Sequence, residues 1–389
     1  MPTYRYLIIG SGMTGRAAAA AIRERDPSGS LGMIGSDPER PYARPPLSKG
    51  LWFGKTRETV YYDPVPGLTF HAPRRAVELD SRTKNVRDDR GEEYRYERLL
   101  LATGARPRRL PFGGEDIIYF RTLADYDRLR AVQGEEVVVI GAGFIGSEVA
   151  AGLASNGKRV TMIFPEEAIG ARVYPAALAT FVTRYFESKG VRMLARSAVA
   201  AIRRGDRRIA VETASGQRLL ADAVVAGIGV SPDVALAESA GITVSDGIEV
   251  NEGFRTSAPE VWAAGDVARF PSAALGERIR VEHEDAALSM GRAAGLSMAG
   301  EAVRYTHLPF FYSDLFDLGY EAVGKLDARL ETVASWKTEG REGVIYYLDG
   351  NRVRGVLLWG IFGQVDAARA LIERGSPIPR DELVRAIGP

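Results

Sequence analysis

The chain has 389 residues, a formal net charge of +1 and no cysteine. A chain of this length is enough for about two or three domains, and its near-neutral charge gives no indication of a nucleic-acid partner. The lack of cysteine excludes disulfides, thiolate-held zinc and iron–sulfur clusters. We predict no metal site of any other kind.

The longest apolar stretch, Val137 to Ala154, is interrupted by Glu148 and by four glycines, so we predict no integral membrane segment. A predicted strand begins within five residues of Met1, which leaves no room for a secretion signal. We therefore expect a cytoplasmic protein.

Residues 6–15, YLIIGSGMTG, indicate a dinucleotide site. The apolar run before the glycines predicts a buried parallel strand, and the alanine-rich segment Arg16–Arg25 predicts a helix. In the motif G-x-G-x-x-G, Gly10 allows a sharp turn, Gly12 lets the backbone approach a pyrophosphate, and Gly15 lets the helix pack on the strand. The unpaired N–H groups at the start of such a helix favour phosphate.

The second predicted strand, Leu31–Gly35, ends where an acid usually holds a ribose. The next residues are Ser36 and Asp37. Asp37 takes this role, or Ser36 binds the ribose more weakly, and the sequence leaves the choice open.

A stiff loop follows at residues 40–52, where three prolines fall within six residues. Such a loop is suited to holding Arg44 and Lys49 against a ligand. The alternative is a solvated surface loop with two ordinary cations.

An internal repeat divides the chain. The segments 91–104, GEEYRYERLLLATG, and 216–229, GQRLLADAVVAGIG, each lead from polar residues through an apolar strand to a closing glycine. Between them, the apolar run 137–140 leads into GAGFIG, a second glycine motif with Gly141, Gly143 and Gly146. A helix over 147–156 and a strand over 160–164 are predicted to follow. The pattern predicts two Rossmann-type units, the second inserted into the first.

Acidic residues end a strand in both predicted units. Glu166 and Glu167 follow the strand 160–164, where a carboxylate accepts hydrogen bonds from a ribose 2′-OH and repels a 2′-phosphate. Arg159 and Arg172 are near in sequence, and their positive charges would instead favour a 2′-phosphate. The alternative to a ribose site is a solvated acidic turn. Within residues 261–267, VWAAGDV, a predicted strand ends in Gly265 and Asp266, where Asp266 faces a ligand or caps the next helix.

His283 precedes a predicted helix, Glu284–Met298, and its sequence context alone favours a structural role. From Tyr305 the pattern changes to that of an α+β domain. We predict strands over Val333–Trp336, Val344–Leu348 and Val353–Trp359. Asp349–Asn351 is predicted to form the hairpin turn between the last two strands, and Val365–Arg374 is predicted to form a helix.

Taken in order, the motifs GSGMTG, RPPLSK, ATG, GAGFIGSE, GIGVSPD and AAGDVA resemble the two-dinucleotide-binding flavoproteins of the glutathione-reductase type. RPPLSKGLW and GAGFIGSEVA are similar to the ferredoxin/rubredoxin reductase branch. VEHED, PFFYSDL and GYEAVG narrow the resemblance to the apoptosis-inducing-factor subgroup, and it covers essentially the whole chain.

The resemblance implies an α/β fold with two Rossmann-type dinucleotide-binding domains, one inserted in the other, plus a C-terminal α+β domain. FAD would bind to residues 1–113 and 247–304, and NAD(P)H to residues 114–246. Residues 305–389 would form the C-terminal domain. NADH is expected in preference to NADPH.

The resemblance also implies roles for single residues. Lys49 would lie near the reactive edge of the flavin, paired with Glu148, and these two are the expected catalytic residues. Phe144 would cover the flavin, Glu166 would bind the adenosine ribose, and His283 would lie beside the nicotinamide. The full set expected to bind cofactor is Gly10, Gly12, Gly15, Ser36, Asp37, Arg44, Pro45, Lys49, Thr103, Gly104, Gly141, Gly143, Phe144, Gly146, Glu166, Gly229, Asp266, Glu282, His283 and Tyr312.

Two residues depart from the family pattern. Ser36 replaces the usual acid, and Tyr312 replaces a tryptophan of the subgroup near the nicotinamide pocket.

The implied reaction moves a hydride from NADH onto FAD and then electrons to a small redox protein of the ferredoxin or rubredoxin type, or to a quinone. The lack of cysteine excludes the branches that need a redox thiol. The alternative is a slow NADH oxidase resembling apoptosis-inducing factor, whose NADH-reduced charge-transfer form is a conformational signal. A homodimer stays open.

Overall fold

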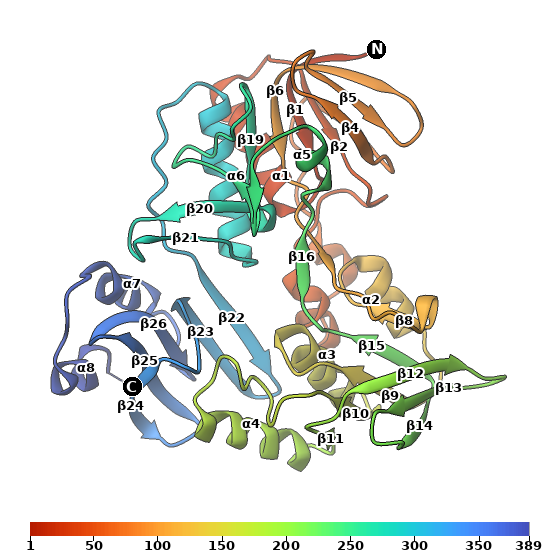
Figure 1. Cartoon of the computed structure of the whole chain (residues 1–389), viewed down its shortest axis with the longest axis vertical. Helices are drawn as coiled ribbons and strands as arrows, with labels where there is room; N and C mark the ends of the chain where they lie inside the picture. The colour runs from red at the N-terminus through yellow and green to blue at the C-terminus, as the bar shows by residue number, and fades with distance from the viewer. Residues whose placement is uncertain (389) are drawn as a thin grey trace. The chain divides into compact units, whose positions relative to one another are not determined.

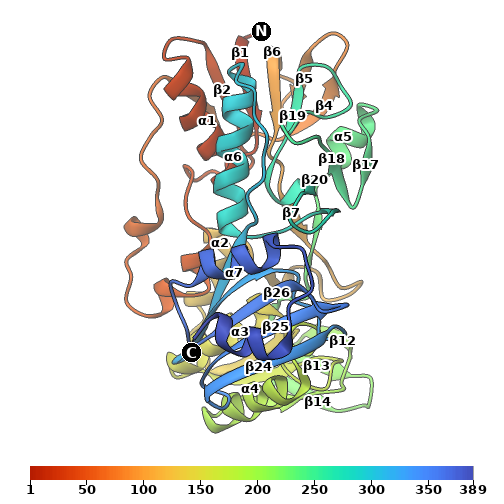
Figure 2. The same cartoon turned by 90° about the vertical axis from the view of Figure 1, so that its left-hand side faces the viewer.

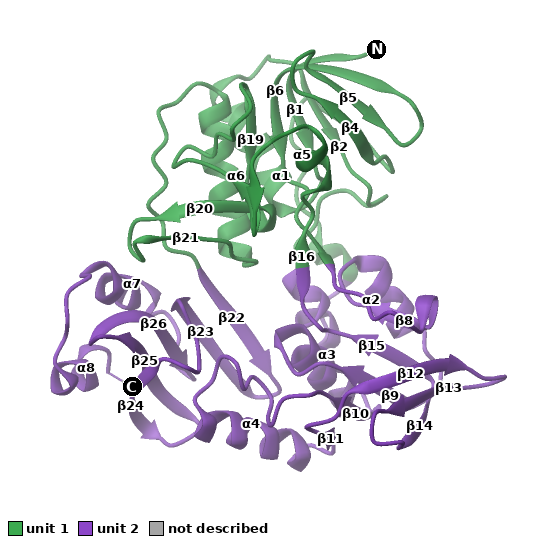
Figure 3. Ribbon diagram, in the orientation of Figure 1, with its two compact units in different colours: residues 1–43, 57–106, 231–309 green, residues 44–56, 107–230, 310–389 purple. Residues whose placement is uncertain are grey.

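A computed structural model describes residues 1–388, which divide into two units (Figure 3). Unit 1 comprises residues 1–43, 57–106 and 231–309, and the described part of unit 2 comprises residues 44–56, 107–230 and 310–388. The domain boundaries expected from the sequence stay a prediction.

Unit 1 is organised around a parallel sheet with the strand order β3-β2-β1-β6, in which β19 also pairs with β6 (Figure 1). Strands β4 and β5 continue it antiparallel. The bounds are β1 (Thr3–Ile9), β2 (Leu31–Ile34), β3 (Leu68–His71), β4 (Ala76–Asp80), β5 (Asn85–Asp88), β6 (Glu93–Leu101) and β19 (Val261–Ala263).

Helices α1 (Met13–Arg25) and α6 (Glu284–Met298) lie side by side in this unit (Figures 1 and 2). Two glycines of α6 make this close packing possible. A Cβ atom on Gly291 would stand 2.4 Å from the carbonyl oxygen of Thr14, and one on Gly295 would stand 2.4 Å from that of Ala18. The start of α1 is thereby held against the middle of α6, and the two helices run in the same direction.

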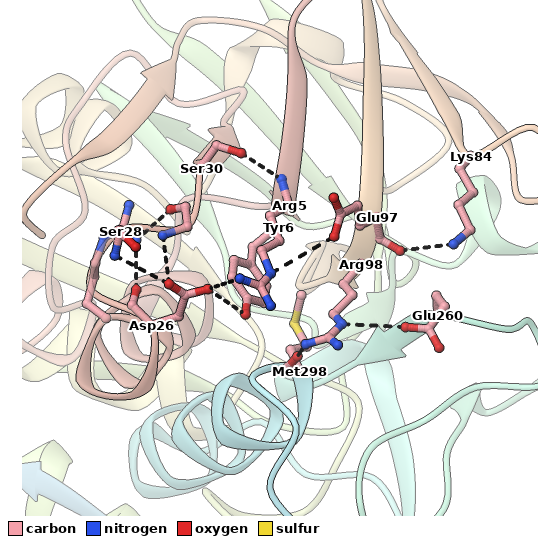
Figure 4. Close-up of polar contacts among 12 residues, drawn as sticks. Arg5, Tyr6, Asp26, Ser28, Ser30, Lys84, Glu97, Arg98, Glu260 and Met298 are labelled. Atoms are coloured by element: carbon pink, nitrogen blue, oxygen red, sulfur yellow. Dashed lines mark hydrogen bonds and ion pairs between the residues drawn. The ribbon is translucent and has the colours of Figure 1, made fainter.

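Polar contacts tie down the opposite ends of these helices (Figure 4). Asp26 caps the end of α1, where it accepts hydrogen bonds from the Gly29 backbone N–H at 2.7 Å and the Tyr6 hydroxyl at 3.1 Å. The Gly29 hydrogen bond lowers the pKa of Asp26. Arg98 of β6 donates to the carbonyl oxygen of Met298, the last residue of α6.

Unit 2 contains a second parallel sheet, with the order β11-β10-β9-β15-β8. Its first four strands repeat the order β3-β2-β1-β6 of unit 1, so the expected pair of Rossmann-type units is confirmed. The bounds of this sheet are β8 (Ile117–Tyr119), β9 (Glu136–Ile140), β10 (Arg159–Ile163), β11 (Arg192–Leu194) and β15 (Ala223–Ala226). The helices of this part are α2 (Leu123–Arg130), α3 (Phe144–Ser155) and α4 (Ala176–Ser188). A separate antiparallel sheet contains β12 (Val199–Arg204), β13 (Ile209–Thr213) and β14 (Arg218–Ala221).

The C-terminal residues of unit 2 form an antiparallel sheet, with the order β22-β23-β26-β25-β24. Its bounds are β22 (Phe310–Leu315), β23 (Leu318–Gly324), β24 (Glu331–Thr338), β25 (Glu342–Asp349) and β26 (Arg352–Trp359), followed by α7 (Val365–Glu373) and α8 (Arg380–Ala386). The expected hairpin turn is present, with positive φ angles of 55° at Gly350 and 63° at Asn351.

The remaining short elements are β7 (Ala105–Pro107), β16 (Val230–Pro232), α5 (Ala235–Ser239), β17 (Val244–Ser245), β18 (Gly247–Glu249), β20 (Ala268–Ser272) and β21 (Glu277–Ile279). Within residues 1–388, no helix combines the length and the apolar character needed to cross a bilayer. The same residues hold no group of three or more acidic or histidine side chains arranged to bind a metal ion.

Candidate active site

The first glycine turn lies where β1 passes into α1. Gly10 has a φ of +116°, and a Cβ atom there would stand 2.0 Å from the carbonyl oxygen of Ala102. A Cβ atom on Gly15 would stand 2.0 Å from the carbonyl oxygen of Gly10. The fold itself therefore requires glycine at these two positions.

Gly12 is different, because its φ of −77° and ψ of −172° are open to any residue. It is the N-cap of α1, and no side chain accepts a hydrogen bond from the first turn of that helix. The helix start therefore presents backbone donors without a side-chain cap, as a phosphate site requires.

The second glycine turn in unit 2 has the same construction. A Cβ atom on Gly141 would stand 2.4 Å from the carbonyl oxygen of Gly227, and one on Gly146 would stand 2.2 Å from that of Gly141. Gly143 has extended backbone angles, caps α3 without a side-chain hydrogen bond, and would meet nothing within 4 Å if it carried a Cβ. Nothing in the fold requires glycine there, whereas a closely approaching pyrophosphate would. The residues present fit a dinucleotide at both turns.

Other predicted residues of unit 1 gather near the start of α1. A Cβ atom on Gly265 would stand 2.3 Å from Thr14 Oγ1, so the short 3₁₀ turn Gly265–Val267, which contains Asp266, lies against the first turn of α1. His283 is the N-cap residue of the adjacent α6.

His283 is partly exposed at its surface, and desolvation lowers its pKa to about 4. The charges of Asp266 and Asp285 act in the opposite direction. His283 is therefore neutral at pH 7, which suits a place beside an uncharged ring system. Asp285 is itself engaged by the ring of His307, 2.6 Å away.

The two alternatives for the first ribose contact differ in their surroundings. Ser36 is exposed. Both carboxylate oxygens of Asp37 already accept hydrogen bonds, from the Glu39 backbone N–H at 3.1 Å and from the Tyr42 hydroxyl at 2.8 Å. The choice between Ser36 and Asp37 stays open.

Three more predicted residues of unit 1 have partners within that unit. The Thr103 hydroxyl donates to the Asp233 carbonyl oxygen at 2.7 Å, and the Asp233 backbone N–H donates to the Gly104 carbonyl oxygen at 2.9 Å. Glu282 pairs with Arg280 at 2.6 Å. Thr103 and Gly104 thus fix the chain at the end of β6.

The proline-rich loop folds into two 3₁₀ turns, Pro45–Leu47 and Gly50–Trp52, with Arg44 as the N-cap of the first. The Trp52 indole donates to the Leu47 carbonyl oxygen at 2.8 Å, and Asn156 donates to the Trp52 carbonyl oxygen at 2.9 Å. These hydrogen bonds hold the loop against the end of α3.

The ion pair expected between Lys49 and Glu148 is present, with Lys49 Nζ 2.8 Å from Glu148 Oε1. The side chains are 13% and 3% exposed. Ser313 Oγ also donates to Oε1 at 2.6 Å, and Ser48 Oγ donates to Oε2 at 2.6 Å. Lys49 Nζ lies 5.1 Å from the ring centroid of Tyr312, within reach of a cation–π contact.

This geometry argues against a minor capping role for Glu148. The residue is the fifth of α3, beyond the first turn that the helix dipole favours for acids. A buried carboxylate needs a counter-charge and hydrogen bonds, and Glu148 has both. The arrangement fixes an ammonium group in one orientation.

The acids predicted to read the second ribose are in ion pairs. Glu166 lies 2.6 Å from Arg172, which is 80% exposed, and Glu167 lies 2.8 Å from Arg196. Phe144, the first residue of α3, is 38% exposed, and its ring centroid lies 5.2 Å from that of Phe311.

Gly229 follows β15 and has a φ of +91°. Its carbonyl oxygen accepts a hydrogen bond from the Arg108 backbone N–H at 3.0 Å. Like Gly104 of unit 1, it fixes the chain just beyond a parallel strand.

Sequence reasoning missed Ser48 and Ser313 as partners of Glu148. Ser48 adjoins Lys49 in the motif RPPLSK, so the sequence could have suggested it as a second partner of Glu148. Ser313 carried no such signal, because its place depends on β22, a strand that the sequence pattern did not show.

Comparisons with known proteins add a family to this geometry. A family profile described as pyridine nucleotide-disulphide oxidoreductase matches residues 4–291. A second profile, the C-terminal part of mitochondrion-associated apoptosis-inducing factor, matches residues 294–342.

The chain is 32% identical to the ferredoxin–NAD(+) reductase component of the anthranilate 1,2-dioxygenase system of Burkholderia cepacia, over 98% of both chains. It is also 32% identical to mitochondrial apoptosis-inducing factor 1 of Dictyostelium discoideum, over 95% of this chain and 78% of that protein. The crystal structure of the covalent putidaredoxin reductase–putidaredoxin complex contains a similar chain, with 28% identity, a TM-score of 0.90 and 99% coverage of both chains.

Proposed function

The chain belongs to the pyridine nucleotide-disulphide oxidoreductase family, and from this premise we propose that it carries electrons from NADH through FAD to a small redox protein of the ferredoxin or rubredoxin type. It is an FAD-dependent NAD(P)H oxidoreductase similar to the ferredoxin reductases. Disulfide chemistry is excluded, because it needs a redox thiol and the chain has no cysteine.

The observation that carries this proposal is the pair of glycine turns. Each helix start lacks a side-chain cap, and each turn has a glycine, Gly12 or Gly143, that the backbone angles do not require. Two such turns support two dinucleotides, as a hydride transfer between NADH and FAD needs. The small redox partner is supported by the ferredoxin reductases and by the putidaredoxin complex.

FAD, when bound, supplies the chemistry that accepts a hydride and releases its electrons to the partner. The turns at Gly12 and Gly143 would bind the two pyrophosphates through backbone N–H groups. Lys49, held by Glu148, would place a positive charge that favours an electron-rich flavin.

The decisive experiment is rapid mixing. The purified protein should be yellow, and NADH should bleach its flavin absorbance under anaerobic conditions. A second mixing step with a [2Fe–2S] ferredoxin, a rubredoxin or a quinone then measures reoxidation. We expect turnover on the order of 1–1000 per second with one of the redox proteins. Reoxidation by every acceptor at no more than the rate seen with dioxygen would reject the proposal.

A second candidate function is slow NADH oxidation of the kind resembling apoptosis-inducing factor, and the profile match at residues 294–342 favours it. In this case the reduced state formed with NADH would last for minutes in air, and the protein would bind different partners in that state. The same mixing experiment, run in air, separates the two functions by the lifetime of the bleached state.

We also propose that the protein is cytoplasmic and that it forms a homodimer. Cell fractionation tests the location. Light scattering before and after addition of NADH tests the homodimer and its dependence on redox state.

A further inference from the structure

A chain of buried hydroxyl groups leads from Glu148 into the C-terminal sheet of unit 2. Ser313 Oγ donates to Glu148 Oε1 at 2.6 Å. Ser313 of β22 is the cross-strand partner of Tyr320 of β23, so their side chains are neighbours on one face of the sheet. The Tyr174 hydroxyl donates to the Tyr320 hydroxyl at 3.0 Å. Two hydrogen bonds, joined by the register of β22 and β23, therefore lead from Tyr174 to Glu148.

The direction of donation at Glu148 follows from the acceptor. A carboxylate can only accept, so Ser313 donates its single proton to Glu148. The Tyr320 hydroxyl, on the neighbouring strand, accepts from Tyr174. The Ser313 hydroxyl dipole thus points toward the carboxylate that holds Lys49.

Ring packing fixes these hydroxyls in place. Tyr320 stacks on Trp359 with 5.4 Å between ring centroids, and Tyr174 packs edge-on against both of these rings. Tyr320 is 0% exposed and Tyr174 is 3% exposed. Burial raises the pKa of both phenols, so both remain donors throughout the neutral range.

We propose that Ser313, Tyr320 and Tyr174 are positioning residues, which act through Glu148 to fix the ammonium of Lys49 for the hydride-transfer step. Lys49 and Ser313 share one carboxylate oxygen, so the Ser313 hydrogen bond sets the orientation of the carboxylate that Lys49 meets. This inference rests on the proposed function. It assigns to the C-terminal sheet a direct influence on the catalytic pair.

Removing one hydroxyl tests the inference. Tyr320→Phe keeps the ring that stacks on Trp359, and Ser313→Ala removes the donor next to Glu148. We expect each variant to reduce flavin with NADH about tenfold more slowly and to have a more negative flavin midpoint potential, with NADH affinity unchanged. Acylation of Lys49 in the purified protein, followed by mass spectrometry, should become faster, because the ammonium is held less firmly.

Two matched controls lie in the same sheet. Tyr346→Phe removes a buried hydroxyl of β25 that accepts from the Ile387 backbone N–H, and Ser335→Ala removes a buried hydroxyl of β24. Within residues 1–388, neither hydroxyl is hydrogen-bonded to Glu148 or Lys49, so the flavin potential, the rate of flavin reduction and the rate of acylation should stay at the parent values. In a Glu148→Gln background, Ser313→Ala and Tyr320→Phe should add no further loss, since they act through Glu148.

Three outcomes overturn the inference, and they are distinguishable. If Glu148→Gln changes the potential and rate but Ser313→Ala and Tyr320→Phe do not, the inference fails and the proposed function stands. If Lys49→Met and Glu148→Gln change neither quantity in a protein that still reduces a redox protein, the inference falls with the role of the pair. If the purified protein holds no flavin, the proposed function fails as well.

Discussion

The ammonium of Lys49 and the carboxylate of Glu148 form a buried pair whose effects should depend on each other. We expect Lys49→Met to keep FAD bound, to make the flavin potential more negative and to slow hydride transfer by about tenfold to a hundredfold. Glu148→Gln should slow the same step by freeing Lys49. The double variant should be less impaired than the two single losses predict together.

Stopped-flow reduction by NADH measures this prediction. Lys189→Met, which removes a lysine of an exposed pair with Asp317, is the control. Strictly additive losses in rate would show that the two charges act independently.

Glu166 should determine the choice of nicotinamide cofactor. A carboxylate accepts from the ribose hydroxyls and repels a 2′-phosphate, so kcat/KM should favour NADH over NADPH by about tenfold to a hundredfold. Glu166→Ala should reduce this ratio, and it also releases exposed Arg172 to meet a phosphate. Glu167→Ala, at the neighbouring acid, should leave the ratio unchanged. Equal use of both cofactors by the parent protein would contradict the assignment.

At the residue scale, sequence motifs led to Lys49 and Glu148 because both lie inside motifs that surround a ligand. Ser313 lies 165 positions from Glu148, and only the pairing of β22 with β23 gives it a defined partner. A contact that depends on strand register cannot be found from the residue types alone.

At the element scale, the two glycine turns lead to a matched pair of substitutions. Gly12→Val should lose FAD, because a side chain there blocks the close approach of a pyrophosphate. Gly143→Ala should keep FAD and raise the Kd for NADH by about tenfold or more. Both residues have extended backbone angles that any residue adopts, so neither substitution strains the backbone.

Flavin absorbance per protein and NADH titration check these two expectations. The thermal midpoint of Gly143→Ala, measured in the FAD-bound protein, should stay at the parent value, since a Cβ there meets nothing within 4 Å. Full flavin occupancy in Gly12→Val would count against the FAD assignment.

The predicted elements were most accurate where the pattern was regular. The helix Glu284–Met298 begins and ends as expected. Helix α3 begins at Phe144 instead of at residue 147, because Gly143 is itself the N-cap. Strands β22 and β23 were not predicted, since the turn between them contains Phe316 at a φ of 61°, a conformation that usually signals glycine or asparagine.

At the scale of the whole molecule, stability should depend on pH through His283. The pKa of His283 is about 4 in the folded protein and 6.5 as a reference, so the unfolded chain binds more protons between these values. Stability should therefore fall as pH falls from about 6.5 to 4. The acids facing His283, Asp266 and Asp285, reduce this effect without reversing it. His71, whose pKa is also lowered by burial, adds to it.

Urea unfolding at several pH values measures this dependence. The variant His283→Gln should lose part of the slope between pH 4 and 6.5, whereas His307→Gln should serve as the comparison at a nearby ring. An unchanged slope in His283→Gln would contradict the prediction.

The overall architecture was predictable because repeated motifs impose it. Two strand–glycine–helix motifs with matching downstream strands gave two Rossmann-type units, and the two sheets share their strand order. The grouping of the loop 44–56 with unit 2 was not visible in the sequence. Within unit 2, the hydrogen bond from Asn156 to the Trp52 carbonyl oxygen joins this loop to the end of α3, 104 positions further along the chain.

The contacts of the loop 44–56 limit where the chain can be divided to build chimeras with its relatives. Ser48 and Lys49, which contact Glu148, come from residues 44–56. Glu148 lies on α3 in the segment 107–230, and Ser313 lies in the segment that begins at residue 310. A chimera that takes only residues 107–230 from a relative would combine the relative's α3 with Ser48, Lys49 and Ser313 of this chain. The carboxylate of the relative's helix would then meet side chains that did not evolve with it. Grafting cofactor preference or partner choice should therefore transfer all three segments together, even though they are scattered along the chain.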